Sequence, residues 1–137
     1  MGKINVVRVL LCGILTGVVA FLLQLAVFVF LLRGTEFVRL VEAAGRPKFP
    51  PLSFLLYIAL GIWAMWLYAA IRPRYGAGAK TAAIAALGLW LLGVIVDLNW
   101  VAGRLTQLSF GGLTAPVGWA LPVIVAATIA GAWLYKE

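Results

Sequence analysis

The stretch whose residue types best suit chemistry is RPRYGAGAKT, residues 72–81. Its glycines and its Lys-Thr pair resemble a phosphate-binding loop, which requires G-x-x-x-x-G-K-[ST] between a strand and a helix. Here Ala79 precedes Lys80, and the segment before the stretch is a long apolar run. The pattern therefore favours a hinge between two helices, with Pro73 ending the first. Three basic residues of the hinge are expected at the lipid headgroups: Arg72, Arg74 and Lys80.

Three polar residues fall within apolar segments, where their burial is costly and suggests a function. Gln24 lies in the first segment, and Asp97 and Asn99 lie near the end of the third. They could form a shared polar spot. Alternatively, Gln24 bonds between helices while the other two cap the third helix at the interface.

Few residues of the chain are of types that could support catalysis. The chain has no histidine, one cysteine and four acidic residues among 137. A serine nucleophile would lack a histidine base, and a metal would lack a cysteine pair. The sequence therefore predicts no catalytic residues and no metal site.

Tryptophans near the middle of predicted segments form another candidate site, because interfacial belts do not explain them. These are Trp63, Trp66 and Trp90. They could face lipid, pack on a partner helix, or line a site for a hydrophobic molecule. No cofactor is predicted, although a bound lipid, quinone or pigment would suit these side chains. The aromatic residues expected in the belts are Trp100, Trp119, Trp133 and Tyr135.

Small residues recur four positions apart in three segments, a spacing that lets helices approach closely. The pairs are Gly13 and Gly17, Ala82 and Ala86, and Ala127 and Gly131. The spacing leaves open whether these faces meet within one chain, between copies, or against another protein.

The elements that position these residues are predicted to be membrane helices. The chain is 65% hydrophobic, against roughly 45–50% in soluble domains. Its mean hydropathy is +1.10. Four segments are long enough to cross a hydrocarbon core about 30 Å thick: about 6–32, 52–71, 81–100 and 116–135. We expect residues 1–137 to form a single all-α domain, a four-helix transmembrane bundle.

The connecting segments predict a topology. TEFVRLVEAAGRP, residues 35–47, indicates a short amphipathic helix at about 35–44, capped by Thr35 and lying at the outer interface. Residues 105–116 are a second candidate for a surface or re-entrant segment. The short second loop carries three basic residues and no acid, which favours the cytoplasmic side for this loop and for both termini.

Two motifs, WLYAAIRPRYGAGAKTAAIAAL and the terminal AGAWLYKE, resemble those of a group of small bacterial four-helix integral membrane proteins. The resemblance implies this fold over nearly the whole chain, in the bacterial cytoplasmic membrane, and implies no activity. Members of the group often carry an acidic residue in the first helix and a glutamate early in the fourth. This chain has Gln24 and GWALPV there, which disfavours a proton-coupled function.

The sequence thus predicts a non-catalytic membrane protein, an accessory or scaffolding subunit of a larger complex such as a respiratory or photosynthetic one. Its partners would be membrane lipids and other subunits or copies of itself. Nucleic acid is disfavoured because the net charge of +7 comes from residues at segment ends. The alternative is a small homo-oligomeric transporter or channel, lined by Gln24, Asp97 and Asn99. A lipid-modifying enzyme ranks last, since Asp97 and Lys80 would face opposite sides of the membrane.

Overall fold

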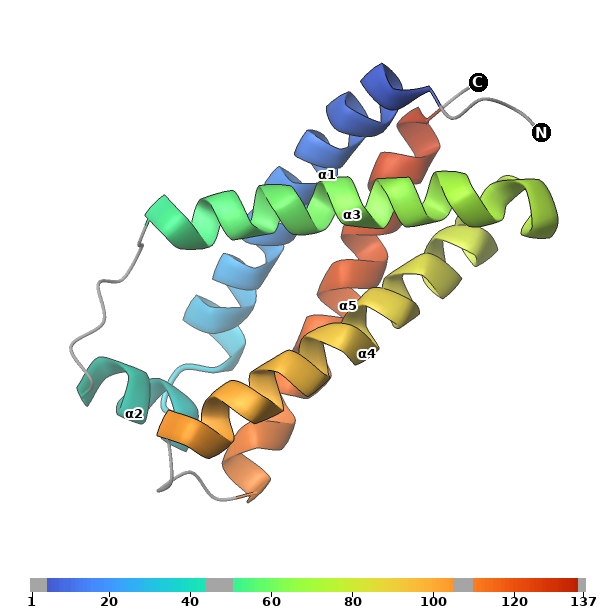
Figure 1. Ribbon diagram of the computed structural model, residues 1–137. Coiled ribbons are helices and arrows are strands. Elements are labelled where there is room, and N and C mark those ends of the chain that lie inside the picture. The colour runs from blue at the N-terminus through green and yellow to red at the C-terminus, as the bar shows by residue number, and fades with distance from the viewer. Residues whose placement is uncertain (1–4, 44–50, 105–109, 136–137) are drawn as a thin grey trace.

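The computed structural model describes residues 5–43, 51–104 and 110–135, together with most of their side chains. Every element in these ranges is a helix. In chain order they are α1 (Val6–Ala26), continued by the π-helical turn η1 (Val27–Leu31), α2 (Glu36–Ala43), α3 (Pro51–Tyr75), α4 (Ala79–Arg104) and α5 (Phe110–Leu134). Four of these helices are long, and the short α2 lies at one end of the bundle (Figure 1).

Three helical segments are long enough and apolar enough to cross a membrane: Val6–Leu31, Ser53–Tyr75 and Thr114–Leu134. In α4 the described apolar stretch, Ala79–Val94, is shorter. Most residues of the three long segments are not buried inside the chain, and large apolar side chains such as Leu11, Leu55 and Leu134 are exposed. Such a surface suits lipid, and the all-helical membrane character predicted from the sequence is confirmed at this level.

Close contact between α1 and α3 organises the core. Gly13 of α1 faces the backbone of Ile62, and Gly17 faces the backbone of Tyr57 and Ile58. Gly61 of α3 in turn faces Gly13 and Gly17, so the two helices meet backbone to backbone. Small residues permit this approach, because in lipid helix association depends on close packing rather than on the hydrophobic effect.

The fifth helix closes the core at the same level. Gly131 of α5 faces the hydroxyl of Thr16 and the sulfur of Met65, and a side chain there would meet both. Two buried threonines of this layer form hydrogen bonds within their own helices. The Thr16 hydroxyl donates to the Cys12 carbonyl at 2.8 Å, and the Thr128 hydroxyl donates to the Ile124 carbonyl at 2.7 Å. The core is therefore filled by small residues whose polar groups are bonded locally.

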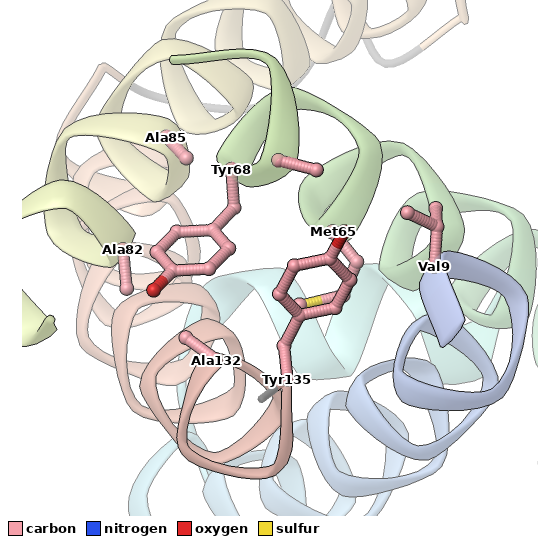
Figure 2. Close-up of a cluster of buried hydrophobic side chains, with 8 residues drawn as sticks. Val9, Met65, Tyr68, Ala82, Ala85, Ala132 and Tyr135 are labelled. Atoms are coloured by element: carbon pink, nitrogen blue, oxygen red, sulfur yellow. The ribbon is translucent and has the colours of Figure 1, made fainter. Parts of the chain in front are cut away.

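Two apolar clusters hold the two ends of the bundle. One contains Val9, Met65, Tyr68 and Tyr135 with four alanines, and joins the start of α1 to the ends of α3 and α5 and to the start of α4 (Figure 2). The other contains Val27, Leu32, Val38 and Val123. Since Val38 belongs to α2, the short helix packs back onto its own chain.

The hinge differs from the sequence expectation. Pro73 does not end the helix, which continues to Tyr75. Pro73 lacks the N–H that would donate to the Ala69 carbonyl, so the helix loses one internal hydrogen bond here and continues for only two more residues. Gly76 ends the helix instead, with φ of +83° and its N–H donating to the Arg72 carbonyl at 2.8 Å. This is the left-handed glycine cap typical of helix C-termini.

Other boundaries also differ by several residues. The predicted third segment, 81–100, is extended at both ends in α4. The predicted fourth segment began at Pro116, but α5 begins at Phe110 and contains Pro116 and Pro122 within it. Internal prolines are tolerated in membrane helices because neighbouring groups satisfy the freed carbonyls.

Candidate functional site

A cavity of about 410 Å³ lies where α3 and α5 end, beside the hinge between α3 and α4. Residues from all three parts of the chain line it. They include Tyr68 and Arg72 of α3, Gly78 of the hinge, and Ile129, Trp133 and Tyr135 at the end of α5. The cavity contains Arg72, one of the predicted headgroup residues, and we take it as the candidate functional site.

Arg72 is held against an aromatic wall. Its guanidinium carbon lies 5.6 Å from the centre of the Tyr135 ring, within the range of a cation–π contact. The Tyr135 and Tyr68 rings meet edge to face, with centres 5.9 Å apart, and both are almost fully buried (Figure 2). Because both rings are fixed by packing, the guanidinium is positioned before any ligand arrives.

The hinge backbone is fixed from the same side. The N–H of Gly78 donates to the Tyr68 hydroxyl at 3.3 Å, a long hydrogen bond. The buried hydroxyl of Thr81 donates to the Gly76 carbonyl at 2.7 Å. With φ of +83° and +141°, Gly76 and Gly78 occupy conformations that other residues rarely adopt. The hinge is thus a defined turn.

The three predicted headgroup residues have different surroundings. Arg72 is half-buried in the cavity, whereas Arg74 and Lys80 are exposed outside it. The sequence interpretation missed Tyr68, and it assigned Tyr135 to an interfacial belt although only 2% of this residue is exposed. One signal was available, since Tyr68 and Arg72 are four residues apart and so share a helix face.

The three mid-segment tryptophans do not share one environment. Trp63 and Trp66 are 59% and 49% exposed, and their ring centres lie 5.8 Å apart on α3. Trp90 of α4 is half-buried and donates its indole N–H to the Val117 carbonyl of α5 at 2.9 Å. Trp90 therefore links two helices, while the other two form a pair on the surface.

The predicted polar spot is described only in part. Gln24 is half-buried. Asp97 and Asn99 belong to α4, but their side chains lie outside the described ones. The predicted packing residues are all buried within the chain: Gly13, Gly17, Ala82, Ala86, Ala127 and Gly131. Their faces are therefore occupied by the chain's own helices. Among the described residues, no group of three or more His, Cys, Asp or Glu could hold a metal ion.

Comparison with known proteins adds no assignment: the sequence matches no family model, and no curated protein or solved structure is significantly similar to it.

Proposed function

We propose that the chain is a non-catalytic integral membrane protein of the bacterial cytoplasmic membrane and an accessory or scaffolding subunit of a larger membrane complex. All four long helices, α1, α3, α4 and α5, would cross the bilayer, and α2 would lie at the outer interface. The predominance of exposed apolar side chains on the three long apolar segments supports this arrangement.

The observation that carries the accessory role is the Trp63–Trp66 pair. It lies near the middle of the Ser53–Tyr75 segment, whereas the tryptophans of membrane proteins are usually found at the interfaces. Both residues are about half exposed, and their rings lie beside each other. Two large adjacent rings on one helix face form a contact surface of the kind that anchors partner proteins.

Trp90 gives the chemical reason why such a surface favours protein over lipid. An indole N–H seeks an acceptor, and lipid tails contain none. Trp90 meets this need with a carbonyl of the neighbouring helix. A helix from another subunit would offer Trp63 and Trp66 the same kind of acceptor, and the two rings would pack on it.

The packing limits where the alternative, a homo-oligomeric transporter or channel, could place its polar path. The contact of Gly61 with Gly13 and Gly17 brings α1 and α3 together backbone to backbone, and Gly131 closes α5 onto them. A polar path would therefore have to run between copies. Gln24 would have to face that path.

The proposal is tested on native membranes. The protein would be extracted in mild detergent and analysed by native mass spectrometry, with every co-purifying chain identified and its stoichiometry measured. We expect a fixed ratio to one or more other membrane proteins. A double substitution, Trp63→Leu with Trp66→Leu, should abolish this association while the protein stays monodisperse.

Trp119→Leu is the matched control, because Trp119 is an exposed tryptophan on α5. It should keep the partner. Recovery of the wild-type chain only as a monomer or homo-oligomer would overturn the accessory role. Equal loss of the partner in both variants would mean that the Trp63–Trp66 pair is not the contact surface.

A further inference from the structure

The cavity beside the hinge has walls of two different chemistries. Arg72 and the hydroxyl of Tyr68 supply polar groups, while Ile129 and Trp133 supply an apolar wall from α5. A volume of about 410 Å³ falls within the usual range for ligand pockets, roughly 300–1,000 Å³. A ligand that matches both walls must itself be amphipathic, with an anionic group beside a hydrocarbon part.

The basic hinge favours an anion. The hinge sequence from residue 72 to residue 81 carries Arg72, Arg74 and Lys80 and no acidic residue. Of these three, Arg72 alone lines the cavity. Its planar guanidinium matches the oxygens of a phosphate in a bidentate manner, whereas a lysine offers only a point charge.

A second donor lies beside the arginine. The Tyr68 hydroxyl accepts the N–H of Gly78, so its own proton remains available for donation to another acceptor. Tyr68 is fixed by the edge-to-face contact with Tyr135, the same ring that supports Arg72. Both donors are therefore positioned by one buried aromatic pair.

The position of the cavity along the predicted membrane spans indicates the source of the anion. The cavity lies at the ends of two spanning segments, Ser53–Tyr75 and Thr114–Leu134. Trp133 is 84% exposed at this level, as expected of a tryptophan at the boundary between headgroups and acyl chains. In that position the polar wall meets lipid phosphates and the apolar wall meets the first carbons of the acyl chains.

We propose that this cavity is a specific site for the phosphate of an anionic membrane phospholipid, bound by Arg72 and Tyr68, with Trp133 and Ile129 against the acyl chain. The proposal rests on the membrane-spanning arrangement given above but not on the accessory role. Arg74 and Lys80 are exposed outside the cavity and contribute only a general, screened attraction to the anionic surface. A bound lipid would join the ends of α3 and α5 to the hinge.

The test uses the purified full-length protein in detergent, with phosphatidylglycerol added and retained lipid counted by native mass spectrometry. We expect one phosphatidylglycerol retained per chain, with Arg72→Gln lowering its affinity roughly tenfold or more, because hydrogen bonds to a charged group are strong. Arg72→Lys should recover only part of the affinity. Arg74→Gln is the matched control and should change it less than about twofold, as expected for a screened surface charge.

A second variant keeps the test informative if Arg72→Gln does not fold. Trp133 is so exposed that Trp133→Leu should leave the fold intact, yet it removes much of the apolar wall and should weaken retention severalfold. Trp119→Leu, another exposed tryptophan of α5, should not. Diacylglycerol, which has no phosphate, should not be retained.

Several results would overturn the site. Equal retention by the wild type and Arg72→Gln, or equal losses in Arg72→Gln and Arg74→Gln, would show that lipid binds the surface without using the cavity. Retention of diacylglycerol would show that phosphate is not recognised. Binding of inorganic phosphate without retention of phosphatidylglycerol would identify a site for a soluble phosphate. Because lipid retention is read on the isolated chain, the result is independent of whether a partner subunit exists.

Discussion

Gly61 of α3 lies directly against the backbone of Gly17 of α1, with no side chain between the two helices. A methyl group at Gly61 would meet atoms of the α1 backbone, which cannot move without displacing the whole helix. We expect Gly61→Ala to destabilise the protein by about 1–3 kcal/mol, the typical cost of overpacking. Thermal unfolding in detergent, followed by tryptophan fluorescence, measures this loss.

Gly93 and Gly118 provide matched controls, because a methyl group at either would meet no atom within 4 Å. Both lie inside helices, where alanine is favoured over glycine by roughly 0.5–1 kcal/mol. Their alanine variants should be as stable as the wild type or slightly more stable. A Gly61→Ala protein that melts with the wild type would contradict the backbone contact.

The hinge glycines should be sensitive for a different reason. Nothing lies within 4 Å of a methyl group at Gly76, so Gly76→Ala introduces no clash. Its φ of +83° nevertheless costs an L-residue roughly 1–2 kcal/mol. Because asparagine tolerates this conformation better, Gly76→Asn should lose less stability than Gly76→Ala in denaturant titrations. Equal losses for the two variants would contradict the left-handed conformation of Gly76 as the cause of the loss.

The bond from Trp90 to the Val117 carbonyl should contribute modestly to stability. Trp90→Phe removes the donor but leaves the aromatic ring, and the carbonyl belongs to the α5 helix. We expect a loss of about 0.6 kcal/mol, and at most about 1.7, as measured for interhelical bonds in membranes. Reversible unfolding in mixed micelles can resolve this difference. Trp119→Phe, at an exposed position, should show no comparable loss.

The helical segments could be predicted from composition alone, since runs of about 20 apolar residues have few other uses. Segment ends were less predictable. Pro73 is a strong local signal against helix, yet α3 passes through it because the next residues complete a capped turn at Gly76. Such an end depends on hydrogen bonds formed after the proline, which a residue-by-residue interpretation of the sequence does not capture.

The candidate site was predictable only through its charge. Basic residues near a segment end indicate headgroup contact, and Arg72 was identified in that way. The aromatic support of Arg72 was not, because Tyr135 is distant in sequence and reaches Arg72 only through the packing of α5 on α3. Similarly, small-residue spacing indicated close helix contacts without naming the partner helix. The structure assigns the contacts of Gly13 and Gly17 to α3, and that of Gly131 to Thr16 of α1 and Met65 of α3.

The four-span topology can be tested by cysteine labelling. Cys12 is the chain's one cysteine and is half-buried, so Cys12→Ala gives a background without reactive thiols. Single cysteines would then replace Glu42 after the first predicted span, Ala77 after the second and Ser109 after the third. In intact cells a membrane-impermeant maleimide should label Glu42→Cys and Ser109→Cys, and should reach Ala77→Cys only after permeabilisation. Labelling of Ala77→Cys and Ser109→Cys from the same side would mean that α4 does not cross the bilayer.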